Sequence, residues 1–397
     1  MINNPVRMMG TALIAATAMS TSAMAGGLER GGYNIDLLFD TSRFATEAGV
    51  IYVMPQRDLE NVTDIDSSDG TQTGATSVRD TESYAVPRLG AKAGIGENVD
   101  CLVDYSQPFG AHTNPGSNYA GSNSNIETKI DSDGYAATCS YKFQAGKGQL
   151  RFIGGISYLE IGGFKERLAG FTVPGPTTFT GVARVDLEGD GVGWRAGVAY
   201  EIPEIAFRAS LMYYSEVDVD IDGVLDTSAL PLVGAVSPIF GNTALPEFVE
   251  LKVQSGIAPG WLAFGSVKWV DWGQMQSIPL CTVGTASCSS STQATSLELG
   301  YQDGWTVTGG VGHKFNDQIS GLVALTWDRG TSTSFGTQSD TWTVSTGASF
   351  AANENLGIRL GGALGVLTSG SSADSRITYD YGNDLVAAVS AAAKLKF

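Results

Sequence analysis

Few side chains in this sequence could do catalytic chemistry. A serine hydrolase needs a histidine beside its nucleophile and an acidic or amide partner for that histidine. The sequence has only two histidines, and neither lies near a nucleophile motif. His112 falls in a Gly/Asn-rich stretch, and His313 falls beside a predicted turn. The sequence therefore predicts no enzyme.

The four cysteines could form disulfides or bind a metal. No CxxC pair is present, so we expect neither a metal site nor a cofactor. Cys281 and Cys288 share one Ser/Thr-rich stretch in which a short disulfide loop closes easily, and Cys101 and Cys139 lie on predicted neighbouring strands. Four cysteines allow three pairings, so the sequence leaves the connectivity open. Disulfides indicate an oxidising compartment.

Two cationic side chains lie among apolar ones on predicted strands. Lys268 shares a strand face with Phe264, and Arg208 shares one with Met212. Such a cation could hold a carboxylate between apolar walls, so Lys268, Phe264 and Arg208 are candidate ligand-binding residues. The alternative is ordinary interior charge that is paired with an acidic neighbour such as Glu201.

A second candidate binding element is the segment 225–245, which is unusually apolar for a connecting loop. Its apolar side chains could form a surface that collects a hydrophobic ligand. The alternative is a loop that packs on itself or on its neighbour at 162–179. The residues concerned are Leu230, Leu232, Val233, Val236, Ile239 and Phe240.

The elements that must position these residues are β-strands. Apolar and polar residues alternate from Leu385 to Phe397, so one face of that strand is apolar throughout. Its length exceeds that of most soluble strands and suits a tilted membrane crossing of about 9–11 residues. Stripes that begin or end on tryptophan, such as 261–269 and 342–350, resemble an aromatic girdle. The sequence therefore predicts an all-β, transmembrane antiparallel barrel.

Turn lengths give the strand number and the orientation. Six short connections alternate with seven long ones, which predicts fourteen strands with both ends on the periplasmic side. The short connections are at 96–99, 146–149, 202–205, 258–260, 316–318 and 352–355. The long ones are around 63–80, 109–127, 162–179, 223–246, 279–293, 329–339 and 369–383. The expected strands are 48–62, 81–96, 98–108, 128–144, 149–161, 180–200, 205–222, 247–257, 261–278, 294–315, 318–328, 340–351, 356–368 and 384–397.

The N-terminal residues divide into two parts. Residues 1–25 have the basic, apolar and small-residue regions of a cleaved signal peptide, with Ala23-Met24-Ala25 as the cleavage site. Residues 26–46 are too poor in apolar side chains to fold alone, and we expect them to form a short hatch, or plug, or a periplasmic segment. The barrel is expected over residues 47–397.

The charge of the chain limits its partners. A net charge of −17 argues against nucleic acid, whose phosphates need a basic surface. Acidic residues concentrate in presumed loops, where they are either solvated or bridge divalent cations to lipopolysaccharide. These residues are Asp64, Asp66, Asp69, Asp218, Asp220 and Asp222.

Three stretches resemble the FadL family of outer-membrane transporters for long-chain fatty acids and other hydrophobic molecules. These are residues 187–223 with a glycine-aromatic pattern, 245–278 with the pair Trp269 and Trp272, and the double hairpin 303–367. The resemblance implies a fourteen-stranded barrel plugged by an N-terminal hatch, and a ligand that leaves sideways through a gap in the wall.

The function expected from these features is passive uptake of hydrophobic molecules, most of all long-chain fatty acids, across the outer membrane of a Gram-negative bacterium. The cargo would be captured at the apolar external loops and passed through the plugged lumen. The expected partners are this ligand, lipopolysaccharide and outer-membrane lipid, and the expected state is a monomer. The alternative is a structural or adhesive barrel, which predicts polar external loops. An outer-membrane lipid-modifying enzyme is the least favoured alternative.

Overall fold

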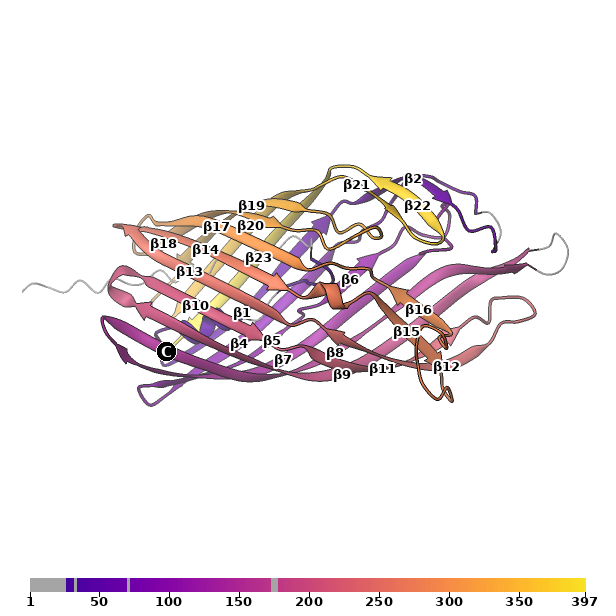
Figure 1. The fold of residues 1–397 in the computed structure, drawn as a ribbon. Helices are drawn as coiled ribbons and strands as arrows, with labels where there is room; N and C mark the ends of the chain where they lie inside the picture. The colour runs from indigo at the N-terminus through magenta and orange to yellow at the C-terminus, as the bar shows by residue number, and fades with distance from the viewer. Residues whose placement is uncertain (1–25, 32–33, 70–71, 173–177) are drawn as a thin grey trace, which may run out of the picture.

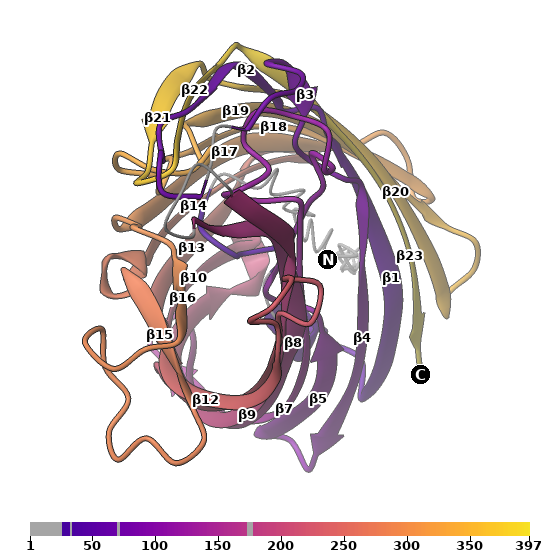
Figure 2. The same ribbon diagram turned by 90° about the vertical axis from the view of Figure 1, so that its right-hand side faces the viewer.

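The computed structural model describes residues 26–31, 34–69, 72–172 and 178–397, so the expected signal peptide lies outside the described residues. Fourteen antiparallel strands close into one barrel, in which the first pairs with the last (Figures 1 and 2). They are β1 (Phe44–Pro55), β4 (Tyr84–Ile95), β5 (Val99–Ser106), β7 (Glu127–Ala145), β8 (Gly148–Thr172), β9 (Thr178–Ile202), β10 (Phe207–Tyr214), β13 (Phe248–Ala258), β14 (Trp261–Val270), β17 (Gly304–Lys314), β18 (Ile319–Asp328), β19 (Thr341–Ala351), β20 (Leu356–Leu367) and β23 (Asp384–Lys396).

The outer surface of the barrel is that of a membrane protein. Alternation puts apolar side chains such as Val344 and Leu364 outside, both more than half exposed, while polar ones line the lumen. Two belts of aromatic residues bound this apolar wall. At the end with the long connections the belt includes Tyr135, Tyr158, Trp194, Tyr213, Trp269, Trp305, Trp327 and Trp342. At the other end it includes Phe44, Tyr141, Phe152, Trp261, Phe315, Phe350 and Phe397.

The predicted strand number and turn pattern are confirmed. Six short turns lie at one end of the barrel and seven longer connections at the other, and each of the fourteen predicted strands overlaps one barrel strand. Both chain ends of the barrel lie at the short-turn end, where the backbones of Phe44 and Phe397 hydrogen-bond to each other. Of the described residues, no helix is long and apolar enough to cross a membrane.

Several predicted boundaries were wrong because alternation continues where the chain leaves the barrel. The expected strand 205–222 is two strands, since β11 (Val217–Asp226) leaves β10 and pairs with β9 and with β12 (Val236–Leu245). The expected strand 294–315 likewise joins β16 (Thr295–Glu298), which pairs with β15 (Ser277–Thr282), to β17.

The expected loop 162–179 is largely strand. β8 and β9 stay paired from Gln149 opposite Glu201 to Thr172 opposite Thr178. Their pairing continues well beyond the belt residue Tyr158. The far end of the pair forms the long ribbons at the right of Figure 1. The barrel wall is thereby continued outside the membrane on this side.

A small sheet lies over the long-connection end of the barrel and is called the cap sheet here. It contains β21 (Gly370–Ala373), β22 (Ile377–Tyr381), β2 (Asp58–Asp64) and β3 (Val78–Arg79). Its apolar face packs around Tyr119 and Tyr379. The predicted first strand, 48–62, was wrong in its bounds because it joined β1 to β2 across the turn at Gln56.

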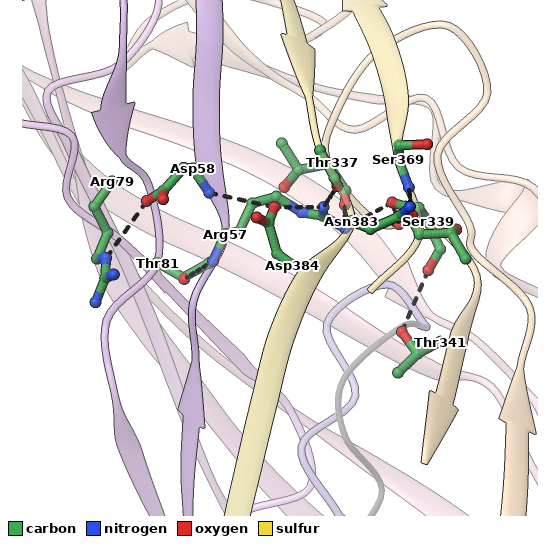
Figure 3. A network of polar contacts seen from close by, with 12 residues as sticks. Arg57, Asp58, Arg79, Thr81, Thr337, Ser339, Thr341, Ser369, Asn383 and Asp384 are labelled. Atoms are coloured by element: carbon green, nitrogen blue, oxygen red, sulfur yellow. Dashed lines mark hydrogen bonds and ion pairs between the residues drawn. The ribbon is translucent and has the colours of Figure 1, made fainter. Parts of the chain in front are cut away.

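Arg57 joins the cap sheet to the barrel (Figure 3). Its side chain is fully buried, and one of its terminal nitrogens lies 2.8 Å from Asp384 Oδ2 and also donates to the Gly382 carbonyl. The other terminal nitrogen donates to Ser339 Oγ at 2.7 Å. The Tyr381 ring lies below the guanidinium, 4.6 Å from Cζ. Arg57 therefore connects three chain segments that are far apart in the sequence.

We expect Arg57→Ala to release the cap sheet, because removal of one partner of a buried ion pair costs about 3–5 kcal/mol. Hydrogen exchange should rise in β2 and β22 while the barrel strands stay protected. Arg79→Ala is the matched control, since Arg79 and Asp58 form an exposed pair 3.5 Å apart in the same region (Figure 3). Exposed pairs contribute about 0–1 kcal/mol, so equal exchange in both variants would contradict the role of Arg57.

The N-terminal segment, residues 26–31 and 34–43, runs inside the barrel. Its short 3₁₀ helix η1 (Ile35–Phe39) buries Leu37 and Leu38 in the main apolar core. Asp40 Oδ2 lies 2.6 Å from Lys394 Nζ of β23. At the other end of the segment, Gly27 adopts a φ of +52° beneath the Trp272 ring, where a Cβ would lie 2.5 Å from ring atoms. The segment thus lies in the lumen and contacts the rest of the protein near both of its ends, at Lys394 and at Trp272.

Candidate functional site

A cavity of about 730 Å³ opens at the long-connection end of the barrel and is called the mouth cavity here. Its walls come from the extensions of β8 and β9, from the loop after β11, from β16, and from the segments at Phe335 and 374–376. Leu225, Leu230 and Leu297 supply apolar surface. The cavity combines apolar walls with charged ones.

Three cations line the mouth cavity: Lys165, Arg167 and Arg376. Lys165 follows Tyr158 by about 20 Å along β8, outside the membrane-spanning part of the strand. Burial, followed by the nearby guanidinium groups of Arg376 and Arg167, lowers the pKa of the Lys165 ammonium to about 8. Within the described part of the chain, neither Lys165 nor Arg376 forms an ion pair. Two carboxylates, Glu298 and Asp374, line the same cavity, so the three cations exceed the acidic side chains by one and the cluster can accept an anion.

An apolar cavity of about 70 Å³ lies next to the mouth cavity and shares Lys165 and Leu297 with it. Its remaining lining includes Ile130, Met275 and, on the N-terminal segment, Leu28. A ligand with an anionic head and an apolar tail could place the head at the cations and the tail among these side chains.

The hydrogen-bonded ladder between β4 and β5 is interrupted toward the long-connection end of the barrel. The β4–β5 ladder stops at Arg88 opposite Ser106. Backbone hydrogen bonding between the segment before β4 and the segment after β5 resumes at Glu82, whose N–H donates to the His112 carbonyl. From Tyr84 to Pro87, β4 pairs with β1 alone. We call this interruption the wall gap.

Two prolines lie at the wall gap, Pro87 on β4 and Pro108 after β5. Neither has a backbone N–H to donate to the ladder. On the other side, the four residue steps from Ser106 to Gly110 lie opposite three steps of β7, so the chain forms a bulge with one extra residue. After the bulge, β6 (Gly110–Thr113) pairs with β7 again.

The two lumen cations predicted to bind ligand, Lys268 and Arg208, form ion pairs with the N-terminal segment. Lys268 pairs with Glu29, and its ammonium lies 4.7 Å from the centre of the Phe248 ring. Arg208 lies 2.8 Å from Asp36, which also pairs with Lys252 at 3.2 Å. Phe264 lies on the same strand as Lys268, and a Cβ on Gly310 would lie 2.5 Å from the end of its ring.

We expect Asp36→Ala to loosen the N-terminal segment, because it leaves two lumen cations without their shared partner. The loss of this partner should lower the local free energy of opening at residues 34–40 by about 3–5 kcal/mol, and the rate of hydrogen exchange there should rise accordingly. Asp317→Ala is the control: Asp317 is 98% exposed in its pair with Lys314, and its loss should change nothing. Unchanged exchange at 34–40 would show that these ion pairs do not hold the segment.

The structure divides the six predicted collecting residues into three groups. Leu232, Val233 and Val236 are exposed, with Leu232 at 83%. Leu230 lines the mouth cavity. Ile239 is buried in the core, and Phe240 lies opposite Cys281 on β15. The loop thus presents an exposed apolar patch, Leu232, Val233 and Val236, beside a residue of the mouth. It is called the collecting surface here, after the role predicted for it.

Two disulfides are present. Cys281 pairs with Cys288 in the loop after β15, and Cys101 pairs with Cys139 at directly opposed positions of β5 and β7. Cys101 alternates with the buried residues Asp100 and Leu102, so this second bridge lies on the lipid side of the wall. It ties β5 to β7 on the short-turn side of the bulge.

The histidines lie far apart. His112 Nε2 is 3.0 Å from Glu127 Oε1 near the mouth, and the His313 ring stacks on Trp261 at the short-turn end, with ring centres 4.3 Å apart. Across the described ranges, no group of three His, Cys, Asp or Glu side chains is placed to hold a metal ion.

The sequence analysis missed the mouth cations and the wall gap. Lys165, Arg167 and Arg376 come from two long connections, and nothing in the sequence places these side by side. Pro87 and Pro108 did carry a signal, since each falls inside or at the end of a predicted strand, where proline marks a break in pairing.

Comparison with known proteins agrees with this geometry. Residues 12–395 match the family model described as outer membrane protein transport protein (OMPP1/FadL/TodX). Two curated relatives are long-chain fatty acid transport proteins of Escherichia coli. That of strain K12 is 23% identical over 82% of this chain and 78% of its own length. That of strain O6:H1 is 25% identical over 82% and 77%.

Solved structures share the fold. A Pseudomonas aeruginosa FadL homologue aligns with a TM-score of 0.78 at 14% identity, over 92% of this chain and 93% of the other. The Pseudomonas putida toluene transporter TodX aligns with a TM-score of 0.62 at 15% identity, over 93% and 96%. The chain belongs to the OMPP1/FadL/TodX family of Gram-negative outer-membrane proteins, whose members transport hydrophobic compounds.

Proposed function

We propose that this transporter takes up long-chain fatty acids. The observation that carries the proposal is the pair of neighbouring cavities: Lys165, Arg167 and Arg376 line the mouth cavity, and the apolar cavity shares Lys165 and Leu297 with it. A neutral hydrocarbon would need no cation there. The curated relatives named long-chain fatty acid transport proteins support the same cargo.

Capture would begin at the collecting surface. Each methylene that leaves water contributes about 0.8 kcal/mol, so exposed Leu232, Val233 and Val236 can hold an alkyl chain transiently. Leu230 then leads into the mouth cavity. The three cations take the carboxylate, and charge-assisted hydrogen bonds favour its ionised form.

The exit we propose is sideways. The lumen below the apolar cavity is filled by the N-terminal segment, which is held by the Asp36 and Asp40 ion pairs. Leu28 lines the apolar cavity, and its carbonyl accepts a hydrogen bond from Gly110 N at the wall gap. We therefore propose the wall gap as the exit. It begins after Ser106, next to Tyr105, whose ring centre lies 5.4 Å from that of the belt residue Tyr135, so it opens at the membrane interface.

The test is uptake of labelled oleate into cells that lack their own fatty acid transporter, with and without this chain. We expect faster uptake with the chain, and competition by unlabelled oleate but not by toluene. Equal oleate uptake in both strains would remove the fatty acid assignment. Competition by toluene alone would indicate an aromatic hydrocarbon cargo instead.

A further inference from the structure

Residues 28–30 of the N-terminal segment cover the lumen side of the wall gap. Arg30 N donates to the Pro108 carbonyl at 2.8 Å, and the Leu28 carbonyl accepts from Gly110 N at 2.7 Å. Between these two bonds, Glu29 forms a bridge with Phe109. The segment therefore adds a very short strand to the bulge.

The side chain of Arg30 extends across the wall gap. Its guanidinium lies 2.7 Å from Asp131 Oδ1 on β7, and its Cζ lies 4.6 Å from the ring centre of Tyr84 on β4. Arg30 is only 4% exposed. The Arg30 side chain thus contacts β4 on one side of the interruption and β7, behind the bulge, on the other.

The sequence makes room for this guanidinium. A Cβ on Gly110 would lie 2.5 Å from Arg30 Cζ, so any larger residue at that position would displace the side chain. The contact between Arg30 and the bulge therefore depends on the absence of a side chain at position 110.

The Arg30 guanidinium still has hydrogen-bonding capacity. Among the described residues its buried Nε donor has no partner, and neither does the Tyr84 hydroxyl beside it. A guanidinium can bind a carboxylate through two parallel N–H donors, and here one edge is not fully used. Asp131 in turn has a second cation, Lys129, at 3.1 Å, so it would not be left unpaired if Arg30 moved.

We propose that Arg30 is the residue that closes the wall gap and selects anionic cargo. The carboxylate of the cargo takes the place of Asp131 on the guanidinium, Asp131 keeps Lys129, and the side chain swings away from Tyr84. A neutral molecule of the same length cannot replace Asp131 as the partner of the guanidinium, so the wall gap stays closed to it. This inference rests on the proposed sideways uptake of fatty acids.

The experiment compares entry of oleate with entry of oleyl alcohol, which has the same chain without the charge. The full-length protein is assayed as wild type, Arg30→Ala and Arg30→Lys in cells, with the folded barrel verified by heat-modifiable mobility. Arg43→Ala is the control, because Arg43 is an exposed cation of the same segment away from the gap.

We expect the wild type to prefer oleate. Arg30→Ala should accelerate oleyl alcohol entry about tenfold and bring the two rates close together, as loss of one charge-assisted contact implies. Arg30→Lys should keep the gap closed to the alcohol but lower the preference, since an ammonium lacks the paired donors. Arg43→Ala should behave as wild type.

An oleate preference that survives Arg30→Ala in a folded barrel would overturn the role of Arg30 while leaving the proposed function intact. A wild type that takes up no oleate would instead overturn the proposed function. If Arg30→Ala does not fold, Gly110→Ala displaces the same guanidinium by contact, and an unchanged preference in that variant overturns the inference equally.

Discussion

Replacing Lys165 by Met should weaken oleate binding about ten- to hundredfold at pH 7, the range expected for loss of a hydrogen bond to a charged group. Among the described residues, Lys165 is the one cation that lines both the mouth cavity and the apolar cavity. Methionine keeps the apolar stem, so the loss reports the charge. Binding of a fluorescent fatty acid to the purified barrel measures the effect.

The same variant should remove a pH dependence. Burial and the neighbouring Arg376 and Arg167 place the pKa of Lys165 at about 8, well below its usual range. The ammonium is therefore lost as the pH rises through 8, while the cargo stays ionised and both arginines stay charged. Wild-type affinity should fall between pH 7 and pH 9, and Lys165→Met should show no such fall.

Two further variants test whether the effect depends on the charge of Lys165 and on its position in the mouth cavity. Lys165→Arg keeps a cation that does not titrate in this range, so its affinity should stay constant from pH 7 to pH 9. Lys147→Met removes an exposed lysine from a turn at the opposite end of the barrel and should bind as wild type. A pH-dependent affinity that persists in Lys165→Met would assign the effect to another group.

The barrel itself could be predicted from local sequence patterns, and the reason is physical. A strand in a membrane wall alternates between lipid and lumen, so 342–350 shows its period and its belt residues Trp342 and Phe350 directly in the sequence. Boundaries were less accurate at positions such as Ser215, where alternation passes from the barrel strand β10 to β11 without a glycine or proline.

The candidate site could not be predicted in the same way. Arg167 and Arg376 are more than 200 positions apart, and only the folded loops bring them to one cavity. Lys268 and Arg208 were correctly placed among apolar neighbours. Their partners, Glu29 and Asp36, belong to the N-terminal segment, whose path through the lumen has no periodic signal in the sequence.

Deleting Pro108 should lower the rate of oleate uptake at least tenfold, while oleate binding at the mouth cavity persists. The bulge exists because one extra residue lies between Ser106 and Gly110 relative to β7. Removal of that residue lets the chain pair continuously with β7, and the residue that takes its place can donate to the ladder. The wall would then close between β4 and β5, so cargo would enter the cavities and have no exit.

Pro108→Ala is the informative control for this deletion. It restores a backbone N–H but keeps the extra residue, so the bulge and most of the uptake should remain. Equal loss in both variants would assign the effect to the proline itself and not to residue count. Normal uptake by the deletion variant, with wild-type binding at the mouth, would mean that the cargo leaves by another path. Passage through the lumen would then require the N-terminal segment to move, and Asp36→Ala should accelerate uptake. If the wall gap is the exit, Asp36→Ala should leave the rate of uptake unchanged.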